Sequence, residues 1–134
     1  MKYYLITPRV DGQTSEEFLE RMFSEHIVMM GWDETTVKGK AFANMNKGDI
    51  VLVAQRVYGK FNYYFAGIVS DSSSNTDGDY QYRKLEHFID LRKTDINILE
   101  GVSFKKMSTI PALQEIHLDK NKSVIDKLNQ IIQL

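Results

Sequence analysis

The sequence has no cysteine, and its 17 basic and 18 acidic residues almost cancel to a formal charge of −1. The missing cysteines exclude disulfide bonds, thiolate metal ligands and cysteine nucleophiles, and they fit a reducing compartment. The balanced charge excludes the overall positive field of a protein that coats DNA without specificity. Any contact with nucleic acid must therefore come from a local group of basic residues.

Long hydrophobic runs are also missing. Nowhere are eighteen consecutive residues apolar, so the sequence offers no helix that spans a bilayer. The N-terminal apolar run is interrupted by Pro8 and Arg9 and is too short for a signal sequence. We therefore expect a cytoplasmic protein with no membrane partner.

The motifs of common enzymes are absent too. The chain has no Walker A loop, no GxGxxG after a strand, no GxSxG elbow and no HExxH. His26, His87 and His117 lie far apart with no second ligand at metal-binding spacing, so we expect neither a metal nor another cofactor. Asp33 and Glu34 are neighbours, which point apart on an extended chain and make a poor acid–base pair. The sequence therefore predicts no catalysis of its own.

What is present is the composition of one folded domain. A length of 134 residues, with 43% hydrophobic and 26% charged residues, suits a single core. Hydrophobic periodicity, a capping box at Thr14 and Glu17 and a cap at Ser123 predict its elements. They are a strand at 2–8, a helix within 11–28, a short strand at 27–32, a short helix within 39–49, strands at 50–57 and 62–69, a strand at 80–92 and a closing helix within 122–134.

The strands around Gly59 form the strongest hairpin signal in the chain. Apolar residues occupy odd and even positions in both strands, so both faces of the hairpin should be covered. The polar segment 70–79 is predicted to be a mobile loop within the domain. The strand after it should place alternate residues on one face, namely Leu85, His87, Ile89 and Leu91.

These elements predict one α+β domain over residues 1–134. It should contain a small, mainly antiparallel curved sheet or β-barrel with flanking helices. Two short basic runs, Arg83–Lys84 and Lys105–Lys106, are typical of solvated faces.

Aromatic side chains gather in and before the hairpin, with basic residues between them. Stacking surfaces beside cations are what a binder of single or extruded bases needs. The competing interpretation is that such rings form the core or cross-strand pairs, which is the more frequent outcome. The aromatic residues are Trp32, Phe42, Tyr58, Phe61, Tyr63, Tyr64 and Phe65, and the basic ones are Lys38, Lys40, Arg56 and Lys60.

Four segments carry a family resemblance: YYLITP, IVMMGWDET, KAFANM and, most specific, MNKGDIVLVAQRVYGKFNYYFAGIVSD. Their order resembles the PUA-like superfamily, specifically EVE-type domains, which are related to YTH modules and to the DNA-reading domains of modification-dependent restriction proteins. The resemblance covers roughly the first seventy residues well and the remainder in general order. It implies a closed or nearly closed barrel that holds a flipped, commonly methylated, base of DNA or RNA between aromatic rings.

The resemblance also implies roles for particular residues. Trp32 would stack on the base or close a cage around a methyl group, and Asp33 or a nearby backbone carbonyl would accept from an exocyclic amine. The strand aromatics Tyr63 and Phe65, or Tyr64, would form the opposite wall. Phosphate contacts would come from Arg56, Lys38 and Lys40, and an effector nuclease or motor would be a possible partner.

Two other functions stay open at this point. The first is a small hydrolase on the same barrel that acts on modified nucleosides, with a polar cluster of Glu34, Thr35, Thr36 and Lys38. The second is a non-catalytic protein-interaction domain in which Trp32 is an ordinary core residue.

Overall fold

The structure is a computed structural model that describes residues 1–7, 16–31, 35–57, 60–78, 80–100, 113–117 and 119–133, with only the backbone of Arg56 and Val57. In chain order its elements are β1 (Tyr3–Ile6), α1 (Glu16–Glu25), β2 (Ile27–Met30), α2 (Val37–Ala43), β3 (Ile50–Val57), β4 (Lys60–Val69), β5 (Asn75–Asp77), β6 (Tyr80–Asp90), β7 (Leu113–Ile116) and α3 (Lys122–Ile132). Among the described residues, no helix has both the length and the apolarity to cross a bilayer.

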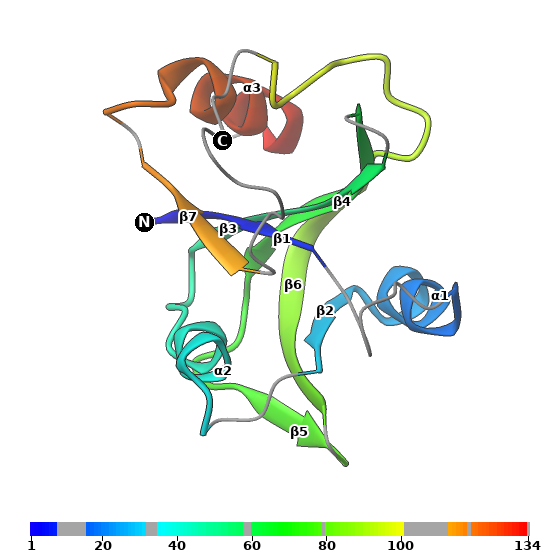
Figure 1. The fold of residues 1–134 in the computed structure, drawn as a ribbon, viewed down its shortest axis with the longest axis vertical. Helices are drawn as coiled ribbons and strands as arrows, with labels where there is room; N and C mark the ends of the chain where they lie inside the picture. The colour runs from blue at the N-terminus through cyan, green and yellow to red at the C-terminus, as the bar shows by residue number, and fades with distance from the viewer. Residues whose placement is uncertain are drawn as a thin grey trace.

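The strands form one strongly curled sheet in the order β2-β6-β4-β3-β1-β7, with β5 paired to β6 (Figure 1). β1 runs parallel to β3, and the other pairs described are antiparallel. β1 thus lies between β3 and β7, although most of the chain separates β1 from β7 in sequence. The prediction of an α+β domain with a curved, mainly antiparallel sheet is confirmed.

Both faces of the central strands are covered, as their continuous apolar sequence predicted. Ile50 and Leu52 of β3 belong to a cluster closed by the apolar face of α3. Val51 and Val53 belong to a second cluster, which includes Met22 of α1 and residues of α2. Figure 1 shows α3 on one side of the sheet and α1 and α2 on the other. We call these the α3 cluster and the α1/α2 cluster.

A β-bulge in β4 changes which side chains face which cluster. Val53 pairs with Phe65, but the next residue of β3, Ala54, pairs with Tyr63, so Tyr64 is the extra residue. Tyr63 therefore packs against the α3 cluster, while Tyr64 and Phe65 both belong on the α1/α2 side. Tyr63 and Tyr64 thus lie on opposite faces of the sheet, whereas Tyr64 and Phe65 lie on the same face.

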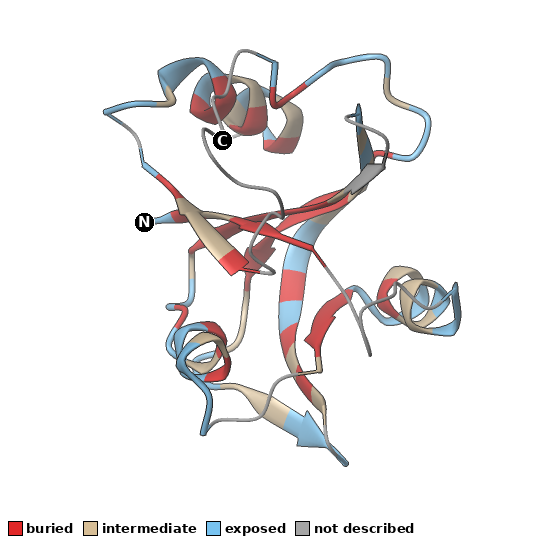
Figure 2. Cartoon of the chain, in the orientation of Figure 1, coloured by how far each residue is buried: buried red, intermediate tan, exposed pale blue. Residues whose placement is uncertain are grey.

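A second bulge in β6 corrects the predicted one-face alternation. His87 has a φ of 50°, and two residues of β6 oppose Gly67 of β4. Leu85 is buried in the α1/α2 cluster, whereas Leu91 is buried in the α3 cluster. The bands of buried and exposed residues along β6 in Figure 2 accordingly lose their strict alternation after Leu85.

Two further predictions differ from the structure. The segment 70–79 contains a strand, β5, whose Asn75 pairs with Tyr82, so its described part is not a plain loop. The closing helix begins at Lys122 with Asn121 at its N-cap, so Ser123 lies inside the first turn and does not cap it. The predicted capping box at Thr14 lies outside the described residues.

Candidate functional site

A cavity of about 270 Å³ lies beside β4, where β6 has ended and the chain turns. This volume is slightly below the ~300–1,000 Å³ typical of small-molecule pockets, so it suits a single base or a ligand of similar size. Three aromatic residues, one arginine and one asparagine are among the residues that line it. The lining residues are Phe61, Asn62, Tyr63, Tyr64, Leu91, Arg92 and Thr94.

The end of β6 and the bulge of β4 create this cavity together. The Leu91 amide donates to the Tyr64 carbonyl oxygen at 2.9 Å, and the chain then turns away from β4. The bulge directs the side chain of Tyr63 to the α3 side of the sheet and that of Tyr64 to the α1/α2 side. Phe61 lies two residues before Tyr63 on the same face, with ring centroids 6.2 Å apart.

Hydrogen bonds hold the two tyrosine rings of the cavity. The Tyr63 hydroxyl donates to Asn97 Oδ1 at 2.6 Å and accepts from the Leu99 amide at 2.9 Å. The Tyr64 hydroxyl donates to Gln55 Oε1 at 2.8 Å. Burial raises the pKa of both phenols, so they stay neutral at ordinary pH. These hydroxyls position the walls, and the ring faces carry the apolar surface of the cavity.

Arg92 supplies the positive charge of the cavity wall. Its guanidinium bonds the Asp90 carboxylate, with the closest contact at 2.7 Å, and lies 3.7 Å from the centre of the Phe23 ring. The hydrogen bonds from Arg92 lower the pKa of Asp90. The cation is thus held in place while part of it remains exposed to solvent.

A row of stacked rings continues from Arg92 along the α1/α2 side of the sheet. Phe23 packs edge-on against Phe65 and Phe88, and Phe88 stacks on Phe65 with centroids 4.6 Å apart. The His26 ring stacks on Phe88 at 4.4 Å with an interplanar angle of 1°. We call Phe23, Phe65, Phe88 and His26 the ring row.

Of the predicted base-binding residues, the structure brings Tyr63 and Tyr64 to the cavity. Phe65 is fully buried, with 0% of its surface exposed, and belongs to the ring row. Trp32 and Asp33 lie outside the described residues, as does the side chain of Arg56.

The predicted phosphate contacts Lys38 and Lys40 lie far from the cavity. Both are on α2, which contacts the beginning of β6: the Gln81 amide donates to the Gly39 carbonyl oxygen at 3.3 Å. Met30, at the end of β2, pairs with the same Gln81. Met30 and Gly39, which precede and follow Trp32 in the sequence, therefore both lie near the beginning of β6. The cavity lies at the end of this strand.

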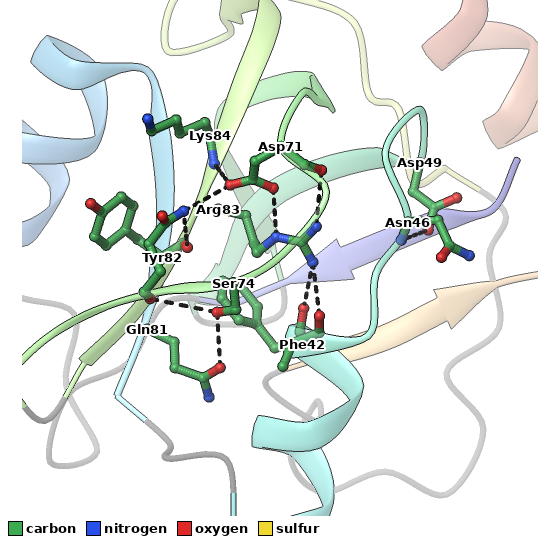
Figure 3. Close-up of polar contacts among 11 residues, drawn as sticks. Phe42, Asn46, Asp49, Asp71, Ser74, Gln81, Tyr82, Arg83 and Lys84 are labelled. Atoms are coloured by element: carbon green, nitrogen blue, oxygen red, sulfur yellow. Dashed lines mark hydrogen bonds and ion pairs between the residues drawn. The ribbon is translucent and has the colours of Figure 1, made fainter.

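A buried polar network fixes α2 to β6 (Figure 3). The Arg83 side chain is 0% exposed, and its guanidinium donates to Asp71 at 2.7 Å. It also donates to the carbonyl oxygens of Phe42 at 3.0 Å and Ala43 at 3.3 Å, at the C-terminal end of α2. The prediction that Arg83–Lys84 is a solvated face is therefore wrong for Arg83, because partners distant in sequence satisfy its charge. Lys84 is exposed, as predicted.

The residues of the hydrolase alternative have structural contacts of their own. Thr36 caps α2, and its hydroxyl oxygen accepts from the Gly39 amide at 2.9 Å. Burial lowers the pKa of Lys38. Glu34 lies outside the described residues, and Thr35 is exposed.

Sequence reasoning missed Arg92, Phe23 and Phe88. Nothing local in the sequence marks them. Arg92 lines the same cavity as Tyr64 because β6 pairs with β4, and Phe88 turns toward the α1/α2 side only at the bulge. In comparisons with known proteins, no family model matches this chain, and a search of curated proteins finds no match either.

Proposed function

We propose that this domain is a nucleic-acid-binding module of the PUA-like type that holds one base, preferably a methylated adenine or cytosine, and has no catalysis of its own. The observation that carries the proposal is the cavity at the end of β6, whose lining residues include Phe61, Tyr63, Tyr64 and Arg92. The curled sheet with helices on both faces is compatible with a PUA-like barrel.

The chemistry of the cavity wall suits a nucleobase. Every base has a π-face, and stacking on one aromatic ring contributes roughly 1–3 kcal/mol. The Asn62 amide can donate to and accept from the edge of a base, and the Arg92 guanidinium can bind a phosphate. Extruding a base from a duplex costs a few kcal/mol, so these contacts favour a base that is already unpaired or readily flipped.

The proposal assigns roles to the remaining predicted residues. Trp32 and Asp33 would recognise the modified group, and Lys38, Lys40 and Arg56 would contact phosphates of the same strand. Because α2 and the cavity lie at opposite ends of β6, a strand that reaches both would have to follow this strand of the sheet.

The net charge of −1 gives this module little long-range attraction for phosphates. We expect modest affinity that falls with salt, which suits a cytoplasmic sensor presented in several copies or joined to an effector nuclease or motor.

Titration of the protein with short single-stranded DNA and RNA at low salt tests the proposal. The strands are unmodified or carry N6-methyladenine or 5-methylcytosine, and binding is measured by anisotropy of a fluorescent label. Tyr64→Leu should weaken binding about 5- to 150-fold, the equivalent of one lost stacking contact. Tyr4→Leu is the matched control, because Tyr4 is a half-buried tyrosine of β1, which pairs with β3 and β7 and not with β6.

A Trp32→Ala variant separates the two parts of the proposed site. If it abolishes the preference for a methylated base while Tyr64→Leu weakens all strands, both assignments hold. If no strand binds, or if Tyr64→Leu binds as the unchanged protein does, the cavity is not a base pocket and the protein-interaction function is favoured.

A further inference from the structure

His26 has an unusual place in the chain. It is the single residue between α1 and β2, and it turns the chain with a φ of 55°. Residues other than glycine rarely adopt this left-handed conformation, which costs roughly 1–2 kcal/mol. The Leu85 amide donates to the His26 carbonyl oxygen at 3.0 Å and holds this backbone in place.

The imidazole of His26 is both stacked and exposed. Phe88 covers one of its faces in a nearly parallel stack, with an interplanar angle of 1°. The residue is nevertheless exposed to solvent. Phe88 covers one face of the ring, so a further ring could stack on His26 only through the opposite face.

A series of ring contacts connects His26 to Arg92, which lines the cavity. The guanidinium carbon of Arg92, a residue that lines the cavity, lies 3.7 Å from the centroid of the Phe23 ring. The Phe23 and Phe88 centroids are 5.8 Å apart, and the Phe88 and His26 centroids are 4.4 Å apart. These steps place His26 within about 14 Å of the Arg92 guanidinium. A strand of a few nucleotides can span that distance.

A phosphate backbone bound along the ring row would lie next to two groups of paired charges. Glu25, the neighbour of His26, is paired with Arg21 at 2.7 Å, and Asp90 is paired with Arg92 at 2.7 Å. Asp90 is thereby neutralised by a guanidinium, whereas Glu25 shares Arg21 with Asp77, which lies 2.6 Å from the Arg21 guanidinium. The exposed Lys93 follows Arg92 in the chain.

We propose that His26 is a second stacking platform, which holds a base flanking the one in the cavity. This inference rests on the proposed function and extends it, because it makes the binding site longer than one nucleotide. The backbone of His26 has a positive φ of 55°. Backbone strain of this kind is concentrated at functional sites.

Proton NMR tests this proposal directly, since the chain has three histidines and their imidazole C–H signals are well separated from the rest. One probe is a single-stranded hexadeoxynucleotide with one central N6-methyladenine, and the other is N6-methyldeoxyadenosine monophosphate. The hexamer should move the His26 signals upfield through the ring current of a stacked base. The monophosphate should occupy the cavity and leave these signals in place, and the signals of exposed His117 should move with neither probe.

The matched variants are His26→Asn and His87→Asn. Asparagine tolerates positive φ, so both keep the backbone conformation while they remove a ring. His26→Asn should weaken hexamer binding about 5- to 150-fold and leave monophosphate binding unchanged, and His26→Phe should restore hexamer binding. His87→Asn, with the same exposure and conformation, should bind both probes as the unchanged protein does.

The outcomes separate this inference from the proposed function. The platform is overturned if His26→Asn binds the hexamer as the unchanged protein does and the His26 signals do not shift. If hexamer binding still depends on Tyr64 in that case, the cavity proposal stands. If neither probe binds at all, the cavity proposal and the platform are both wrong.

Discussion

The Arg83 guanidinium lies 2.7 Å from the Asp71 carboxylate, and the arginine side chain has no exposed surface. Asp71 also accepts from the backbone amide of Lys84 at 2.7 Å and from the Asn75 side chain at 3.0 Å. One ion pair thereby joins the segment before β5, the middle of β6 and the C-terminal end of α2.

We expect Asp71→Asn to lower the free energy of unfolding by about 3 kcal/mol or more, because it leaves a buried guanidinium without its counter-charge. Urea denaturation measures this loss. The same substitution at Asp77, which pairs with Arg21 on the surface at 2.6 Å, should cost less than about 1 kcal/mol. Equal losses for the two variants would show that Arg83 does not depend on Asp71.

Asp49 is a buried carboxylate that serves two backbone donors. It is 2% exposed and accepts from the amides of Lys2 at 2.9 Å and Asn46 at 2.7 Å. Asp49→Ala should lower the free energy of unfolding by about 2 kcal/mol or more, since both amides lose their partner. Asp126→Ala on the exposed face of α3 is the control and should cost less than about 0.5 kcal/mol in the same thermal or urea measurement.

Tyr63 holds the segment that follows β6. Tyr63→Phe removes the acceptor of the Leu99 amide, so hydrogen exchange at Leu99 should speed up several-fold while exchange in β3 stays unchanged. Tyr64→Phe is the matched control, because its hydroxyl bonds only a side chain among the described contacts, Gln55. Unchanged exchange at Leu99 in Tyr63→Phe would contradict this role of the phenol.

Asp90 should titrate below the usual carboxyl pKa of about 4, because Arg92 hydrogen-bonds its charged form. Arg92→Gln should return the pKa of Asp90 toward its usual value, as followed by carboxyl NMR. Lys93→Gln should change it less, since Lys93 acts only at a distance. A pKa lowered on folding stabilises the protein above the unfolded value, so the stability difference between the unchanged protein and Arg92→Gln should vanish as pH falls through the pKa of folded Asp90.

Most elements of this fold could be predicted from local sequence. The helix of α1 and the apolar face of α3 follow from hydrophobic spacing, and the unbroken apolar run of β3 correctly indicated two covered faces. These predictions succeed because each depends on residues close together in the chain.

The wrong predictions concern residues whose burial or direction depends on contacts with segments distant in the sequence. The sequence around Arg83 is typical of a surface residue, and only the fold places Asp71 and the end of α2 next to its guanidinium. β4 and β6 each contain a bulge, and the extra residue of a bulge shifts the alternation of side chains between the two faces of the sheet.

The candidate site could be predicted only in part for the same reason. Tyr63 and Tyr64 stood out as aromatic residues in a hairpin, and both line the cavity. Arg92 and the ring row depend on how far β6 runs along β4, and periodicity does not determine where a strand pair ends. Phe65 is part of the ring row because the bulge directs it inward beside Tyr64.

The position of β1 between β3 and β7 has a consequence for how the protein is made. The hydroxyl of Tyr3 donates to Asn129 Oδ1 at 2.6 Å, so the first strand is bonded to the last helix as well as to its two neighbours. Contacts between such distant segments slow folding, because a long loop must close before they form. On the ribosome, the first strand must wait for almost the whole chain to emerge before its pairing is complete.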